Sequence, residues 1–388
     1  MLSCSSPSGS SSSDQAAAVP ASDTSNMVLV GAERITDYVP QLGTMRVGFL
    51  VNHTSLVSGV HLVDTLLALG VMVKKIFAPE HGFRGIAGAG ETVSSSVDEK
   101  TGLPIISLYG SNKKPKSTDL EDIDVVLFDI QDVGARFYTY ISTMTYMMEA
   151  CAVKGLTFMV LDRPNPNGHY VDGPVLKSEC SSFIGLHEIP IVHGMTVGEY
   201  ARMINDWKFI GCELVVVPCL NYDHNTFYDL PVKPSPNLPN MKAIYLYPSI
   251  GLFEMTKMSV GRGTDKQFQV IGHPQFTTGD FYFTPEDKPG ANNPKYEKQR
   301  CRGYDLSTIN TDSLRSMRRI NLAWLLEAYL QFGSALFEAN YCILSGTQEL
   351  QRQIESGITE EQIRASWEED LKAFKKMRRQ YLLYPDFE

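Results

Sequence analysis

Runs of consecutive apolar residues alternate with segments of helical periodicity through the first half of the chain. The runs predict buried strands at residues 46–51, 71–78, 105–109, 124–128, 157–161 and 213–217. Between them, apolar side chains recur at helical spacing over 62–69 and 141–151, and Gly70 and Gly155 end these helices. Because short, continuously apolar strands alternate with helices, we predict an α/β fold whose parallel sheet is covered on both faces.

The second half of the chain has a different pattern. Thr196 and Glu199 form a capping box that opens a helix reaching about Trp207, and a proline-rich segment follows at 231–239. Beyond it come short strand-like pieces and two helices, one with an apolar face at 322–330 and one capped by Thr359 and Gln362. We therefore expect a main domain at 28–265 and a smaller C-terminal α+β domain at 266–388.

Composition places the chain among ordinary globular proteins. Of its 388 residues 43% are hydrophobic and 20% charged, and no run of 18 apolar residues occurs. The formal net charge is −9, which argues against general nucleic-acid binding because that binding depends on neutralising phosphates. A local basic pocket for a small anionic ligand remains compatible with this charge.

Residues 1–27 have little to bury. Serines crowd the start and alanines follow, so this stretch predicts a disordered tether. Leu2, Ser3 and Cys4 stand at its head and resemble the end of a bacterial lipobox, although no basic and apolar leader precedes them. We predict that Cys4 is lipidated, the alternative being an incidental cysteine. The other six cysteines form no CxxC pair and are expected to be mostly buried.

Polar residues concentrate in the loops that follow the predicted strands. These loops are residues 51–54, 79–85, 129–136 and 162–168. In an open parallel sheet, ligands bind beyond the carboxyl ends of the strands. The sequence therefore predicts a functional site at this edge of the sheet.

Several enzyme classes lack their motifs here. Gly85, Gly88 and Gly90 make GxxGxG rather than the dinucleotide-binding GxGxxG, and a serine run follows instead of a helix. A nucleotide-dependent enzyme is therefore disfavoured. The GxxxxGK[ST], GxSxG and HExxH motifs are also missing from the sequence.

The charged loop residues each allow two interpretations. Glu80, at the end of a buried strand, suits a general acid with a raised pKa, or an ion pair with Arg84. Asp129 and Asp132 suit a metal site, acid–base catalysis or, for Asp132, the cap of the next helix. Arg136 and Arg262 are candidate carboxylate ligands or surface ion-pair partners, and Tyr138 suits sugar stacking or core packing.

Five ordered motifs carry a family resemblance. They are PEHGFRG at 79–85, DIQDVGARFY at 129–138, DRPNPNG at 162–168, PIVHGMTVGE at 190–199 and GRGT at 261–264. From about Val28 onward the chain resembles the exo-β-N-acetylmuramidase family of NamZ type. The resemblance implies a Rossmann-like domain, a smaller auxiliary domain and a cleft between them. It also implies release of terminal N-acetylmuramic acid from the non-reducing end of peptidoglycan fragments, with Glu80 as acid/base.

The resemblance and the loop positions together define the expected site. Glu80 is expected to be catalytic, and Asp129, Asp132 and Glu254 compete for the role of second carboxylate. The residues expected to bind substrate are Asn52, His53, His81, Arg84, Gln131, Arg136, Tyr138, Arg163, Asn165, His193 and Arg262. We expect no metal or organic cofactor, and muramyl glycans as the partner.

Two broader expectations follow. Lipidation of Cys4 would place the protein in the bacterial cell envelope, on the periplasmic side or in the outer membrane, close to wall fragments. The alternative from another class is a non-catalytic lipoprotein that binds wall glycans in the same cleft. Replacing Glu80 by Gln would separate the two, because only a hydrolase needs the acid.

Overall fold

The main domain is built on a seven-stranded sheet. The computed structural model describes Met1, residues 27–84 and residues 96–388, so the predicted tether and Cys4 lie outside the described residues. The strands are β1 (Val47–Val51), β4 (Val73–Ala78), β5 (Ser96–Val97), β6 (Pro104–Ser107), β7 (Val125–Asp129), β8 (Thr157–Leu161) and β9 (Glu213–Val217). Their order is β5-β6-β4-β1-β7-β8-β9, and only β5 runs antiparallel to its neighbour.

This order confirms the predicted fold class. Taken along the chain, the six parallel strands are arranged 3-2-1-4-5-6, which is the order of the Rossmann fold. The succession of strands across the sheet reverses between β1 and β7, the position beyond whose strand ends such sheets bind ligands. The loops that follow these two strands are joined here, because the Gln131 amide donates to the Thr54 hydroxyl at 3.0 Å.

Helices cover both faces of the sheet because alternate side chains of each strand point to opposite sides. Phe49 and Leu127 pack on one side with α1 (Ile35–Leu42) and α2 (Leu62–Ala68). Leu50 and Phe128 pack on the other with α3 (Tyr140–Lys154) and α4 (Val197–Trp207). The continuously apolar strands are therefore buried on both faces, as the sequence predicts.

Local signals placed several helix ends correctly. Helix α3 ends at Gly155, whose φ of +66° is left-handed, and the capping box of Thr196 and Glu199 opens α4. Two helices that the pattern does not predict, α1 and α5 (Met241–Ile250), each contain a proline, Pro40 and Pro248. Proline normally interrupts a helix, so only the surrounding tertiary structure favours these two.

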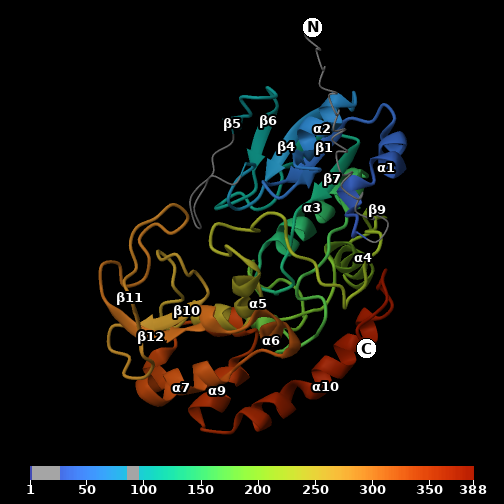
Figure 1. The fold of residues 1–388 in the computed structure, drawn as a ribbon. Coiled ribbons are helices and arrows are strands. Elements are labelled where there is room, and N and C mark those ends of the chain that lie inside the picture. The colour runs from blue at the N-terminus through green and yellow to red at the C-terminus, as the bar shows by residue number, and fades with distance from the viewer. Residues whose placement is uncertain (2–26, 85–95) are drawn as a thin grey trace.

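The auxiliary domain joins a small sheet to several helices (Figure 1). Its antiparallel strands lie in the order β10 (Val270–His273), β12 (Cys301–Asp305) and β11 (Phe281–Phe283). Its helices are α6 (Thr311–Ser316), α7 (Ala323–Phe332), α8 (Cys342–Ser345), α9 (Gln348–Glu355) and α10 (Glu360–Arg378). The short hairpin of β2 (Leu56–Val57) and β3 (Val60–His61) belongs to the main domain instead. One hydrophobic core extends from α3 and α4 into this domain, so the two domains share their packing.

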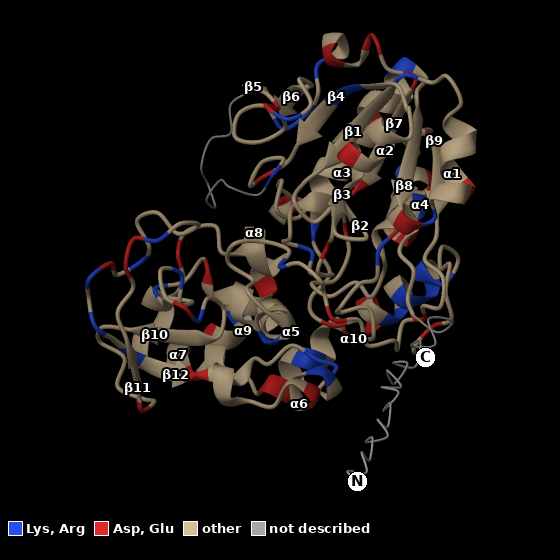
Figure 2. Cartoon of the chain, turned by 45° about the horizontal axis from the view of Figure 1, so that its top comes forward, with Lys and Arg blue, Asp and Glu red and all other residues tan. Residues whose placement is uncertain are grey.

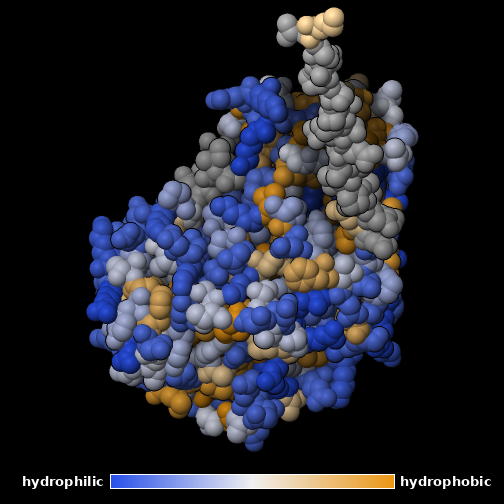
Figure 3. All heavy atoms as spheres, in the orientation of Figure 1, coloured by the Kyte–Doolittle hydropathy of each residue, from blue (hydrophilic) through white to orange (hydrophobic). Residues whose placement is uncertain are grey.

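Basic and acidic residues are both distributed along the ribbons of the two domains (Figure 2). The face drawn in Figure 3 is mostly hydrophilic, with apolar residues scattered over it. Among the described residues, no helix is both long and apolar enough to cross a membrane.

The last residues of the chain return to the main domain. Helix α10 runs along the base of the molecule toward α4 (Figure 1), and the Tyr381 hydroxyl donates to Asp206 of α4 at 2.6 Å. Tyr384 is buried, where its hydroxyl donates to Asp162 at 2.6 Å and accepts from the Cys219 amide at 2.8 Å. The tail therefore ties the auxiliary domain to the edge of the sheet.

We predict that Tyr384→Phe lowers the free energy of unfolding by about 2 kcal/mol, because it removes a hydrogen bond to a buried carboxylate and leaves the Cys219 amide unpaired. Tyr381→Phe is the matched control, since its bond to Asp206 is exposed and should contribute less than about 1 kcal/mol. Urea denaturation of both variants measures the difference. Equal effects would contradict the anchoring role of Tyr384.

Candidate active site

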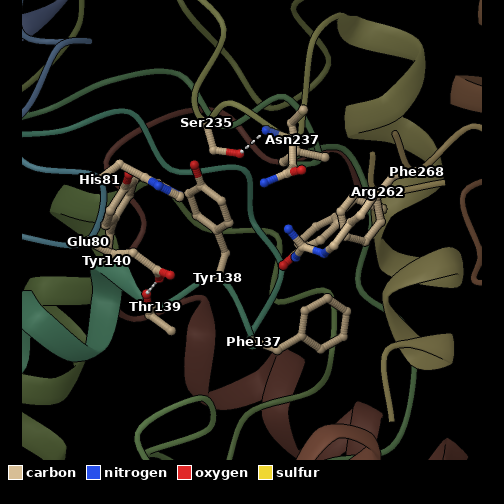
Figure 4. Close-up of a pocket in the computed structure, with 12 residues that line it drawn as sticks. Glu80, His81, Phe137, Tyr138, Thr139, Tyr140, Ser235, Asn237, Arg262 and Phe268 are labelled. Atoms are coloured by element: carbon tan, nitrogen blue, oxygen red, sulfur yellow. Dashed lines mark hydrogen bonds between the residues drawn. The ribbon is translucent and has the colours of Figure 1, made fainter. Parts of the chain in front are cut away.

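Glu80 stands two residues beyond the carboxyl end of β4, at the edge of the sheet where the sequence predicts a site. Its side chain is half-buried, and each oxygen accepts a hydrogen bond from a hydroxyl. Tyr109 donates to Oε1 at 2.9 Å. Thr139, just before α3, donates to Oε2 at 3.3 Å, a contact drawn in Figure 4. The carboxyl group is therefore held in one orientation by two neighbouring loops.

The backbone beside Glu80 is strained. His81 has a φ of +71°, a left-handed value that a residue with a side chain adopts at a cost of about 1–3 kcal/mol. The Gly82 amide donates to the Pro79 carbonyl at 3.0 Å, closing a tight turn directly after the strand. This turn directs the Glu80 side chain along the cleft instead of into the core.

Two adjoining cavities form the cleft between the domains. They share Glu80, Phe137, Thr139, Tyr247 and Arg262. The inner cavity is also lined by His81, Tyr138, Tyr140, Ser235, Asn237, Leu238 and Phe268. The outer cavity, of about 600 Å³, is also lined by Tyr109, Gly110, Lys113, Ser182, Phe183, Ile184, Glu254, Met255 and Ile343. Both domains therefore contribute to one site.

Arg262 faces Glu80 across the inner cavity, and Phe268 lies behind it (Figure 4). Its guanidinium binds Glu254 through two hydrogen bonds, from Nε at 2.7 Å and from a terminal nitrogen at 3.0 Å, and lies 5.0 Å from the centre of the Phe268 ring. Such a two-point pair fixes both side chains and matches their charges. The auxiliary side of the cleft thus presents a rigid, neutral ion pair.

Aromatic rings form much of the inner wall. Tyr138 meets Tyr140 edge to face at 4.9 Å between ring centres, Phe137 meets Tyr247 at 5.1 Å, and Tyr247 meets Phe268 at 5.0 Å. The Tyr138 hydroxyl donates to the Pro234 carbonyl at 2.8 Å. All five rings are buried, so their edge-to-face packing fixes the shape of the inner wall, and the space large enough for a sugar ring is the outer cavity.

Family models match almost all of the described chain. The model for the N-terminal part of exo-β-N-acetylmuramidase NamZ matches residues 47–242, and that for its C-terminal part matches residues 245–384. The chain belongs to the NamZ family. The two models meet between residues 242 and 245, earlier in the chain than the boundary at 265 predicted above.

Individual relatives agree with this membership. The chain is 38% identical to the peptidoglycan β-N-acetylmuramidase NamZ of Bacillus subtilis, over 90% of this chain and 89% of that protein. A DUF1343 family protein of Bacteroides fragilis is 46% identical, covers 93% of this chain and 99% of its own, and superimposes with a TM-score of 0.87. A second one from the same organism is 26% identical, with 92% and 99% coverage and a TM-score of 0.76.

Several residues of the NamZ motifs lie beneath the cleft, not in it. Asp129 and Arg163 are fully or almost fully buried and pair through two hydrogen bonds, of 2.5 and 2.9 Å. Burial raises the pKa of Asp129, and the charge of Arg163 opposes that rise. Gln131, also buried, donates to the Pro164 carbonyl at 2.8 Å. These side chains join the loops after β7 and β8 and support the floor of the site.

Arg136 lies in the interior as well. Its side chain is 1% exposed and donates to the carbonyls of Pro174 and Ile189, both at 2.8 Å, and of Leu344 at 3.2 Å. Burial lowers its pKa to about 9. The structure thus places Arg136 where it joins the two domains, whereas Arg262 lines the cleft.

Three other predicted ligands contact main-chain groups. The buried amide oxygen of Asn52 accepts from the Thr54 amide at 2.9 Å, and the buried Asn165 amide donates to the Met195 carbonyl at 2.8 Å. His193 is buried, and burial lowers its pKa to about 3. All three therefore shape the loops that surround the cleft.

Two further predicted ligands line neither cavity of the cleft and make structural contacts. A ring nitrogen of His53 lies 2.9 Å from the Lys233 carbonyl, in the loop beside the inner cavity. Arg84 binds Asp98 through two hydrogen bonds, of 3.0 and 2.9 Å. The ion pair considered above for Glu80 and Arg84 is thus made by Arg84 with another carboxylate.

The helix cap that was one of the alternatives for Asp132 is not formed, because α3 begins only at Tyr140, after Thr139. Instead Oδ1 accepts from the Gly134 amide at 2.7 Å, and Oδ2 has no partner among the described residues. Burial raises its pKa from 3.8 to about 7. No three His, Cys, Asp or Glu side chains gather to hold a metal ion within residues 27–84 and 96–388.

The sequence motifs did not indicate several residues that line the cleft. Tyr109 and Lys113 follow a short strand with weak apolar character, and Asn237 lies in the proline-rich segment. Thr139 comes directly after the Asp129 motif, so extending that motif by one residue would have found it. Tyr247 belongs to α5, a helix that the pattern did not predict.

The buried Asp132 predicts a pH dependence of stability. The pKa of Asp132 is about 7 in the folded protein and about 3.8 in the unfolded chain. As the pH rises, the unfolded chain therefore loses this proton at a lower pH than the folded protein does. Stability should therefore fall as pH rises from about 4 to about 7, by up to about 4 kcal/mol, and level off above that. In Asp132→Asn this fall should be absent, because an amide does not titrate in this range.

Melting temperatures of wild type and Asp132→Asn between pH 4.5 and 8 test this prediction. The difference between the two proteins should shift in favour of the variant as the pH rises. Parallel curves over the whole range would show that Asp132 does not titrate between the folded and unfolded states.

Proposed function

We propose that this protein is an exo-acting glycoside hydrolase that releases N-acetylmuramic acid from the non-reducing end of peptidoglycan fragments. Membership of the NamZ family and the likeness to the Bacillus subtilis peptidoglycan β-N-acetylmuramidase support the reaction. In this chain the proposed reaction is supported above all by the placement of Glu80. Two hydroxyls hold its carboxyl group in a cleft that aromatic residues line.

Glu80 is the general acid in this proposal. Its proton passes to the glycosidic oxygen as the bond from that oxygen to the sugar's anomeric carbon breaks. The anomeric carbon then carries positive charge until water adds to it, and the water's proton restores the acid. Tyr109 and Thr139 act as positioning residues because their hydrogen bonds fix the direction of the carboxyl group.

Glu254 is the best placed of the candidate second carboxylates. It lines the outer cavity together with Glu80, whereas Asp129 and Asp132 are buried below it. Its two hydrogen bonds from Arg262 hold the carboxylate in one orientation, and a carboxylate fixed in this way can stabilise a positive transition state or orient water. We therefore assign this role to Glu254 and a supporting role to the buried aspartates.

A glycan-binding protein without turnover is the second candidate. The outer cavity of about 600 Å³ favours it, because a cleft of this size lined by Tyr109 and Phe183 can hold a sugar whether or not a bond is cleaved. The two candidates differ in what they require of Glu80, since binding needs no proton donor.

We predict that Glu80→Gln lowers the rate by about 10²–10⁴-fold, because the amide is isosteric but cannot supply the proton. The measurement is release of N-acetylmuramic acid from a disaccharide with a muramyl residue at its non-reducing end. Glu213→Gln, an exposed position at the start of β9, is the matched control and should retain full activity. A well-folded Glu80→Gln variant with wild-type turnover would remove the assignment.

We further propose that the protein works in the bacterial cell envelope, attached through lipidated Cys4. Support comes from the Leu2-Ser3-Cys4 sequence, the serine-rich stretch behind it and a substrate derived from the wall. An anchor at one end of such a tether would leave the cleft free to reach soluble fragments.

Expressed from its native gene, the protein should incorporate a labelled fatty acid and appear in the membrane fraction. Cys4→Ala should lose both properties while its specific activity stays unchanged. Cys180→Ala, which alters a buried cysteine, is the control and should remain labelled. Wild-type protein found unlabelled and only in the soluble fraction would refute the anchor.

A further inference from the structure

Two basic side chains, Arg262 and Lys113, are found among the described residues that line the cavities of the cleft. Their surroundings differ. Both Nε and a terminal nitrogen of Arg262 bind Glu254, so its charge is already matched inside the protein. A substrate anion that approached Arg262 would have to compete with a fixed carboxylate.

Lys113 has no such partner. Among the described residues no carboxylate forms an ion pair with it, whereas its neighbour Lys114 pairs with Glu149 at 2.6 Å. The Lys113 ammonium lies 4.6 Å from the centre of the Phe183 ring, which belongs to the same cavity wall. The ring holds the ammonium by a cation–π contact that leaves its hydrogen-bond donors available.

The charges of the cleft explain what Lys113 can recognise. Glu254 and Arg262 pair with each other, and the hydrogen bonds from Tyr109 and Thr139 to Glu80 come from uncharged hydroxyls. Among the described residues that line the outer cavity, Lys113 is the cation that no carboxylate pairs with. A negatively charged substituent close to the scissile bond therefore meets an unmatched cation.

We propose that Lys113 binds the lactyl carboxylate of the terminal sugar and thereby selects N-acetylmuramic acid. This sugar differs from N-acetylglucosamine only by the lactyl ether, so the carboxylate is its sole charged group and the natural feature to recognise. The inference rests on the proposed function. From the sequence, Arg136 and Arg262 were the candidate carboxylate ligands. We assign this contact to Lys113 because Arg136 is buried and Arg262 is paired with Glu254.

The test compares two substrates in two proteins. One substrate is a nitrophenyl β-glycoside of N-acetylmuramic acid, and the other is the same compound with its lactyl carboxylate converted to the neutral methyl amide. In the wild type the charged substrate should have a kcat/KM about 10–100-fold higher, the range expected for a hydrogen bond to a charged group. In Lys113→Met this preference should disappear, with little change on the neutral substrate.

Controls separate recognition from folding. Lys114→Met should keep the preference for the charged substrate, and Lys113→Arg should retain part of it. Melting temperatures show whether each variant is folded. If Lys113→Met is unstable, Lys113→Gln takes its place. A preference retained in Lys113→Met, or an equal loss on both substrates, would overturn the inference. If the wild type cleaves neither compound nor the muramyl disaccharide, the proposed function fails instead.

Discussion

Parallel pairing of β4, β1 and β7 forces the loops after these strands to leave the sheet at one edge, and the site depends on this constraint. Glu80 and the segment from Asp129 to Thr139 are far apart in sequence but adjacent in space for this reason. The loops after β1 and β7 are joined by the hydrogen bond from the Gln131 amide to Thr54, and the cleft is lined by the loops after β4 and β6 and by residues 137–140. The auxiliary domain then covers the open side and contributes Glu254 and Arg262.

The loops beyond the strand ends bury many backbone N–H and C=O groups, and each of these groups needs a hydrogen-bond partner. The side chains of the motif residues supply many of these partners. Arg163 with Asp129, Gln131 with Pro164 and Asn165 with Met195 join neighbouring loops below the cleft. Few of these side chains reach the cavities. Their role is to hold the floor rigid, so that the strained turn at His81 keeps Glu80 in place.

The two domains act as one body because their contacts are both apolar and polar. The core around α3 and α4 continues into the auxiliary domain, and Arg136 bridges from the main domain to the Leu344 carbonyl. The tail after α10 returns to Asp162 through Tyr384. A cleft lined from both sides needs this rigidity, since a small shift between the domains would separate Glu254 from Glu80.

The sequence by itself determined the strands, most long helices with their caps, the fold class and the position of Glu80. These properties depend on local periodicity and on short motifs, which are visible along the chain. Tertiary structure decided which polar residues face the cleft. Arg136 is buried against the Leu344 carbonyl, 208 positions later in the chain. Arg262 pairs with Glu254, and Lys113 lies beside Phe183 with no ion-pair partner among the described residues. Burial and charge pairing depend on contacts between distant segments, and these contacts exist only once the chain has folded.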